Sequence, residues 1–178
     1  METPQAIQRS AAWMWIGIVA AGAAARLLPH PWNFTPLIAI GLFAGARARR
    51  AVTGVLAVLL SLALSDIVLG FHRGFEWVYA AALIPVLLGR LARSRGFISI
   101  AAAALASSLS FFVVTNFAVW AAGQLYPRTL AGLGACYVAA LPFYGNQFAG
   151  DVFYTVLMFG GYALLARRRA PVLRPVDA

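Results

Sequence analysis

Long apolar stretches alternate with short polar runs along the whole of this 178-residue chain. Several stretches approach the roughly 20 residues that a helix needs to cross the hydrocarbon core of a membrane. Backbone polar groups inside lipid must bond to one another, which favours helices. The pattern predicts an all-α, polytopic membrane protein with a single transmembrane domain over residues 1–178. We place six transmembrane helices at about 11–28, 37–46, 51–69, 77–88, 97–122 and 148–166.

The first two spans each allow an alternative. Arg9 and the small residues at 23–25 resemble a secretory signal with its cleavage site, but we favour an uncleaved helix. Three prolines between residues 29 and 36 exclude a regular helix in the loop that follows. The second span, 37–46, is short, and the Arg side chains after it can extend its reach by snorkelling.

Residues 129–143 are apolar but do not fit the spacing of the spans. A helix of this length would measure about 22 Å, against a hydrocarbon core of roughly 30 Å. We therefore predict a short re-entrant or interfacial helix on the outer face. Irregular backbone at membrane depth is tolerated where it lines a cavity.

The basic residues favour one orientation. All 14 are Arg, and the formal net charge is +9. Most stand in clusters beside the spans, and a cytoplasmic excess of such residues is the rule for membrane proteins. Six spans with both termini cytoplasmic satisfy that rule: Arg9, Arg174 and the clusters at 47–50, 90–95 and 167–169 lie inside, while Arg26, Arg73 and Arg128 lie outside.

Two other arrangements break this rule. If 129–143 also crossed the membrane, or if 37–46 did not, a cluster of Arg residues would face outward. We interpret the clusters and the basic C-terminal tail, 167–178, as topological signals. They do not indicate nucleic-acid binding.

Composition narrows the class of function. The chain is 62% hydrophobic and 11% charged, with a mean hydropathy of +0.82. It contains no Lys, so it cannot hydrolyse ATP through a P-loop. One Cys excludes a disulfide scaffold, and common catalytic motifs are absent. We therefore expect that the protein is not an enzyme and binds no cofactor. We also expect no metal site, because His30 and His72 stand on separate loops.

Two polar side chains lie within predicted spans near the outer surface. Asp66 stands about 24 Å along its helix from Arg50. An intramembrane acid is a site candidate by default, although it can also serve a helix end. Asn116 shares a helix face with Phe112 and Trp120 at i, i+4 and i+8, which suits a flat polar ligand. The alternative is that Asn116 holds helices together and Trp120 anchors the interface.

Further polar and aromatic residues fall at the same predicted level. Asp151 is predicted to start the last helix and to complement its N-terminus. Ser107, Ser108 and Ser110 indicate close helix packing, and Cys136 packs as a small apolar residue. The candidate ligand-binding residues are Asn33, Asp66, His72, Phe112, Asn116, Trp120, Tyr126, Tyr137 and Asn146.

Four segments together resemble an uncharacterised family of small bacterial membrane proteins described only as transport proteins. They are RLLPHPWNFTPLIAIGLFAG (26–45), SDIVLGFHR (65–73), SSLSFFVVTNFAVWA (107–121) and YPRTLAGLGACYVAALPFYGNQFAGDV (126–152). The family often has Pro at the position of Trp32. The resemblance covers most of residues 26–160 and assigns no functional residue, because the family has no known ligand.

More distantly, the pattern is similar to the substrate-binding S components of energy-coupling-factor transporters. That resemblance implies six helices, both termini inside and an outward-facing site for a vitamin or metal. It also implies docking on a separate transmembrane coupling subunit with its ATPases, through a face such as Ala20, Ala21, Ala24 and Ala25.

From these observations we expect a substrate-binding transport subunit in the bacterial cytoplasmic membrane, which takes up a small nutrient such as a vitamin. Its partners would be membrane lipid, that nutrient and the coupling subunits. A structural or assembly protein without a ligand is one alternative, and a small proton-coupled permease using Asp66 is another. An intramembrane enzyme comes last.

Overall fold

The computed structural model describes residues 4–93 and 95–169, with side chains for 12–93 and 95–167. Over these residues the fold is all-α, as the apolar pattern predicts. Most of the predicted basic tail, residues 170–178 with Arg174, lies outside the described residues. The six helices are α1 (Pro4–Leu27), α2 (Leu37–Arg47), α3 (Ala51–Leu69), α4 (Phe75–Ala92), α5 (Gly96–Ala122) and α6 (Leu130–Arg169).

Four helices are long and apolar enough to cross a membrane, which indicates a membrane protein. They are α3, α4, α5 and the part of α6 between Leu130 and Arg167. The apolar parts of α1 and α2, Ala12–Leu27 and Leu37–Arg47, are shorter. The predicted third span coincides with α3, and the fourth and fifth each lie within the observed helix.

The shortest helix, α2, forms the centre of the bundle. Every residue from Leu37 to Ala46 is buried, and α2 contacts each of the other five helices. Its closest approach is to α4, where Gly45 faces the carbonyl of Val86 and Gly89 faces the carbonyl of Leu42. A Cβ at either glycine would overlap the opposing oxygen. Two glycines thus allow the backbones of α2 and α4 to touch.

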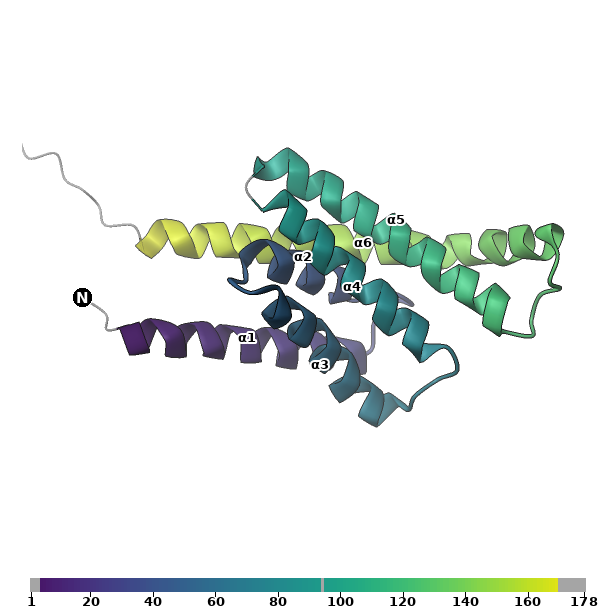
Figure 1. Cartoon of the computed structure of the whole chain (residues 1–178), viewed down its shortest axis with the longest axis horizontal. Coiled ribbons are helices and arrows are strands. Elements are labelled where there is room, and N and C mark those ends of the chain that lie inside the picture. Colours follow the sequence, from purple (N-terminus) through teal and green to yellow (C-terminus); the bar gives the residue numbers. More distant parts are fainter. Residues whose placement is uncertain (1–3, 94, 170–178) are drawn as a thin grey trace, which may run out of the picture.

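The helix ends that carry the Arg clusters lie together. Figure 1 shows the start of α1, the α2–α3 and α4–α5 connections and the end of α6 toward the left of the view. The α3–α4 and α5–α6 connections lie toward the right, and the α1–α2 connection lies nearer the middle of the view. Arg47 also braces its end of the bundle, since its guanidinium lies 4.8 Å from the ring centroid of Tyr162 and 5.7 Å from that of Phe159.

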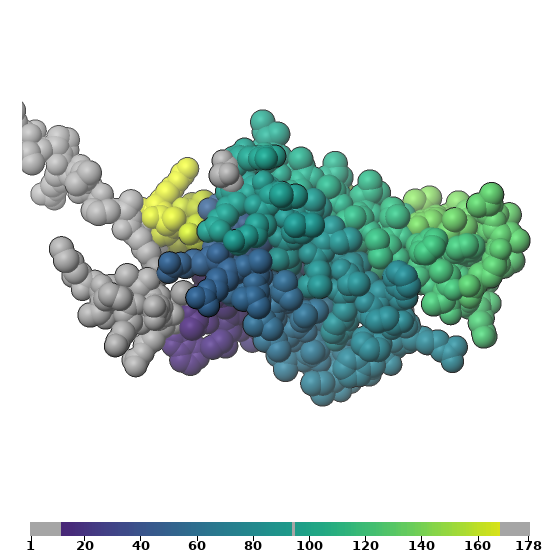
Figure 2. Space-filling view, viewed as in Figure 1, coloured from purple at the N-terminus to yellow at the C-terminus, as the bar shows by residue number. Residues whose placement is uncertain are grey.

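One prediction about the helices is wrong. Residues 129–143 and 148–166 do not form two elements, because α6 runs unbroken through Pro142. Its 40 residues measure about 60 Å, twice the thickness of a hydrocarbon core. The prediction treated residues 129–143 as a separate piece too short to span, whereas residues 130–143 are the first turns of α6. The start of α6 projects beyond the bundle beside the end of α5 (Figure 2).

Candidate functional site

The loop between α1 and α2 lies part-way along the length of the bundle because α2 is so short (Figure 1). An 11-residue helix measures about 16 Å, roughly half of a hydrocarbon core. Asn33 adopts a left-handed conformation with φ of 63°, and the amides of Phe34 and Thr35 bond to the carbonyls of Pro31 and Asn33 over 3.0 Å. Irregular backbone at such depth is expected where it lines a cavity.

Aromatic contacts hold this loop on α6. The ring of Phe34 lies 5.9 Å from that of Phe153 and 5.6 Å from that of Tyr154. At Gly150 a Cβ would stand 3.1 Å from the Cα of Phe34, so the glycine permits this close approach. Trp32 extends the contact by packing edge-on against Phe143. The loop is therefore fixed over the middle of α6.

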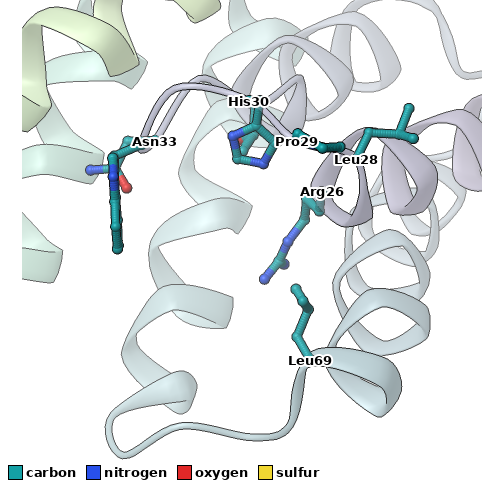
Figure 3. Close-up of a pocket in the computed structure, with 8 residues that line it drawn as sticks. Arg26, Leu28, Pro29, His30, Asn33 and Leu69 are labelled. Carbon is teal, nitrogen blue, oxygen red and sulfur yellow. The ribbon is translucent and has the colours of Figure 1, made fainter.

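Two adjoining hollows lie beneath the loop. The first, here called the loop pocket, has a volume of about 510 Å³ and is shown in Figure 3. In that view the Arg26 side chain extends from the end of α1 toward Leu69, below His30. The loop pocket is lined by Arg26, Leu28, Pro29, His30, Trp32, Asn33, Thr35 and Leu69.

The second hollow, the inner cavity, lies between the loop and the bundle and measures about 310 Å³. It shares Arg26, Asn33 and Thr35 with the loop pocket, so the two are contiguous. Its volume lies at the lower end of the range typical of ligand sites, roughly 300–1,000 Å³. The inner cavity is lined by Arg26, Asn33, Thr35, Leu37, Ile38, His72, Val78, Phe111, Thr115, Asn116, Val119, Gln147 and Asp151.

The side chain of Asp66 is engaged in an ion pair. Arg26 Nη2 donates a hydrogen bond to Asp66 Oδ1 over 2.6 Å, and the Asp66 side chain is 2% exposed. Among the described residues this is the one ion pair, and Asp66 does not line either hollow. Asp66 thus fixes the cation that borders the cavity. The second nitrogen, Arg26 Nη1, is buried and has no hydrogen-bond partner in the described part of the chain.

The face of α5 that borders the inner cavity differs from the predicted face by about one position in the sequence. The cavity residues are Phe111, Thr115, Asn116 and Val119. Phe112 instead packs against the ring of Tyr144 at 4.6 Å. The indole nitrogen of Trp120 donates to Pro127 O over 2.9 Å. Of the predicted trio, therefore, only Asn116 borders the cavity.

A polar stripe on α6 contributes two of its residues, Gln147 and Asp151, to the inner cavity. Gln147, Asp151 and Thr155 are all buried and lie at i, i+4 and i+8. Gln147 donates its amide to Ser108 O over 2.9 Å and is 3.3 Å from Ser108 Oγ. The stripe does not appear among the predicted site residues, although its spacing is visible in the sequence. Asp151 was predicted to start a helix, which is wrong because α6 begins at Leu130.

The other predicted site residues are dispersed. Asn33 and His72 line the inner cavity. Tyr137 donates its hydroxyl to Val113 O over 2.8 Å and packs on Phe112, outside both hollows. Asn146 precedes the cavity residue Gln147 but does not line either hollow, and neither does Tyr126, in the α5–α6 connection.

The predicted docking residues lie on α1, which packs mainly against α3. Ala20, Ala21 and Ala24 are exposed and Ala25 is half-buried. The buried face of α1 instead carries Gly22, where a Cβ would stand 2.5 Å from Ile40 Cδ1. The small residues therefore remain accessible on the outside of the bundle.

The site as a whole offers polar groups in an apolar surround. Three amides, a threonine pair, Arg26, His72 and Asp151 border the inner cavity, between the side chains of Phe111, Val78, Val119, Leu37 and Ile38. Within the residues that the structure describes, no three His, Cys, Asp or Glu side chains stand close enough to hold a metal ion. The arrangement suits a small organic molecule with several polar groups.

Comparison with known proteins assigns the chain to a family. Residues 6–173 match the family described as "Family of unknown function (DUF6580)", and the chain therefore belongs to it. None of the curated proteins and none of the solved structures matches the chain significantly.

Proposed function

We propose that this member of the family is the substrate-binding subunit of a transporter in the bacterial cytoplasmic membrane. It binds a small nutrient, such as a vitamin or a related compound, in the inner cavity. It contributes no ATPase of its own, so separate transmembrane and ATPase subunits drive uptake. The chain itself performs no catalysis.

The observation that carries this proposal is the polar lining of the inner cavity. Asp151 borders it with a side chain that is 3% exposed, and Asp151 Oδ2 has no hydrogen-bond partner among the described residues. Polar groups at membrane depth are costly, and those that face a cavity commonly mark a substrate pathway. A bundle that only had to pack would leave few voids of this size.

The proposed topology has six spans and both termini in the cytoplasm. The start of α1, the α2–α3 and α4–α5 connections and the end of α6 then face inward, and the loop pocket opens to the outside. A nutrient would enter beneath the 28–36 loop. The exposed Ala20, Ala21 and Ala24 on α1 leave a smooth surface on which a coupling subunit can dock.

A structural or assembly role is the second candidate, because several polar side chains serve packing. The amide of Asn116 donates to Phe112 O in its own helix over 2.8 Å, and Tyr137 and Gln147 bond to α5. In that case the polar residues hold helices together and the cavity has no ligand. A proton-coupled permease is less favoured, since Asp66 is neutralised by Arg26.

Native mass spectrometry of the full chain, purified from its host in mild detergent, tests the proposal. We expect a co-purifying small molecule that is lost from Asn116→Ala. The matched control is Asn146→Ala, which removes the same side chain from a position outside the cavity. An empty wild-type protein, or equal loss from both variants, would favour the structural role.

A further inference from the structure

The two buried acids of the bundle differ in their surroundings. Asp66 is 2% exposed and is paired with Arg26 over 2.6 Å. Asp151 is 3% exposed, and no ion pair of Asp151 occurs among the described residues. Burying a charge without a partner is strongly unfavourable, or forces the group to neutralise. A buried acid without a partner, such as Asp151, is therefore a candidate binding residue.

The groups next to Asp151 are neutral, and none of the described residues forms an ion pair with it. Gln147, one turn earlier on α6, directs its amide nitrogen to the oxygens of Ser108. Thr155, one turn later, has a buried hydroxyl without a partner in the described part of the chain. Arg26 borders the same cavity, but its charge is balanced by Asp66. Asp151 is therefore the one carboxylate among the residues that line the inner cavity.

The size and lining of the cavity favour an organic occupant over an inorganic ion. A volume of about 310 Å³ is roughly ten times the share of one water molecule in the liquid, far more than a bare cation needs. A single carboxylate is also too few ligands for a divalent metal. Phe111, Val78 and Val119 provide apolar surface, and the Phe111 ring is a further surface that attracts cations.

We propose that Asp151 binds the cationic group, a protonated amine, of a small organic ligand in the inner cavity. This inference rests on the proposed function, because it requires that the cavity binds a ligand. The amine donates charge-assisted hydrogen bonds to the Asp151 carboxylate. Asn33, Thr35 and Asn116 supply neutral polar contacts to the rest of the molecule.

Matched pairs of small probes test the charge requirement. The full-length protein in lipid nanodiscs is titrated with benzylamine and 2-phenylethylamine, and with benzyl alcohol and 2-phenylethanol as neutral counterparts of similar shape. We expect the amines to raise the apparent melting temperature at concentrations about tenfold lower than the alcohols. Asp151→Asn should abolish the response to the amines, and it also controls for partition of the probes into lipid.

The stability of the unliganded variants gives a second readout. We expect Asp151→Asn to melt at the same or a higher temperature than wild type, because it removes an uncompensated buried charge. Asp66→Asn is the matched control and should melt lower, because it leaves Arg26 without its partner. A merely structural Asp151 would lower the melting temperature in the same way as Asp66.

The remaining outcomes separate this inference from the proposed function. If amines and alcohols stabilise wild type and Asp151→Asn equally, the cavity binds ligands without using the carboxylate, and only the cation inference is overturned. It is likewise overturned if no amine binds while a neutral or anionic molecule co-purifies. If no probe binds and no small molecule co-purifies, both the cation inference and the proposed function are overturned.

Discussion

Arg26 at the end of α1 donates a hydrogen bond to Asp66 in α3, and the two atoms lie 2.6 Å apart. Both side chains are largely buried, with 15% and 2% of their surfaces exposed. The contact joins residues 40 positions apart in the sequence. It fixes the last turn of α1 against α3, immediately before the loop that covers the inner cavity.

Loss of this ion pair should destabilise the fold. We expect Asp66→Asn to lower the free energy of unfolding by about 3 kcal/mol, because breaking a buried pair leaves a charge without compensation. Denaturant titration in detergent micelles measures this change. Replacing both Arg26 and Asp66 with Leu should lower the free energy of unfolding by less than replacing Asp66 alone. If the loss in the double variant equals the sum of the losses in the two single variants, the ion-pair explanation is contradicted.

The close contact of α2 with α4 should not tolerate a methyl group. We expect Gly89→Ala to lower the free energy of unfolding by about 1–3 kcal/mol, because its Cβ would overlap Leu42 O. Gly160→Ala is the control, since nothing lies within 4 Å of a Cβ there. Thermal unfolding followed by circular dichroism distinguishes them. Equal stability of the two variants would mean that the helices can move apart without cost.

Trp120 and Asn116 should differ in their effect on ligand binding. We expect Trp120→Phe to retain the co-purifying molecule, because Trp120 bonds to Pro127 O at the α5–α6 connection and does not line the cavity. Asn116→Ala should release it. Native mass spectra of the two variants provide the comparison. If only Trp120→Phe loses the molecule, the ligand binds to the face of α5 that the sequence predicts, which carries Trp120.

The orientation in the membrane can be read from single cysteines. In a Cys136→Ala background, Arg73→Cys in the α3–α4 connection should react with a membrane-impermeant maleimide in intact cells. Arg49→Cys in the α2–α3 connection should react only after the membrane is permeabilised. Both side chains are exposed, so burial does not limit the reaction. The opposite pattern of labelling would reverse the proposed topology.

The unbroken course of α6 predicts a long distance between its ends. Spin labels at Leu130→Cys and Leu164→Cys, again without Cys136, should lie about 50 Å apart, since they are separated by 34 residues. Both positions are exposed and should accept a label. Pulsed electron resonance measures this distance. A markedly shorter value would restore a break near Pro142.

The boundaries of α3 and α5 could be predicted because sharp polar signals flank them. The Arg cluster before Ala51 and Gly70 after Leu69 mark both ends of α3. Residues 144–147, Tyr-Gly-Asn-Gln, and the preceding Pro142 also resemble a break between two apolar stretches, but α6 continues through them. The length of α6 depends on its packing against α5 and α2, which the local pattern does not contain.

The candidate site was only partly predictable for a related reason. Asn33, His72 and Asn116 were found because polar residues in or beside apolar stretches are conspicuous. The sequence places Asp151 near a helix terminus only because the predicted start of the last helix, residue 148, lies 18 residues after the observed start of α6. The pairing of Arg26 with Asp66 depends on how α1 lies across α3, and no periodicity within either helix reveals it.

The short length of α2 also affects how the chain is inserted into the membrane during synthesis. Eleven residues are too few to enter the membrane alone, and α4, the helix that α2 contacts most extensively, is synthesised only after α3. We expect α2 to enter the membrane together with α3 as a hairpin, and to remain open to lipid or to chaperones until α4 emerges from the ribosome. A nascent chain interrupted before α4 would display the future core as an unpaired apolar hairpin, the kind of surface that membrane proteases recognise.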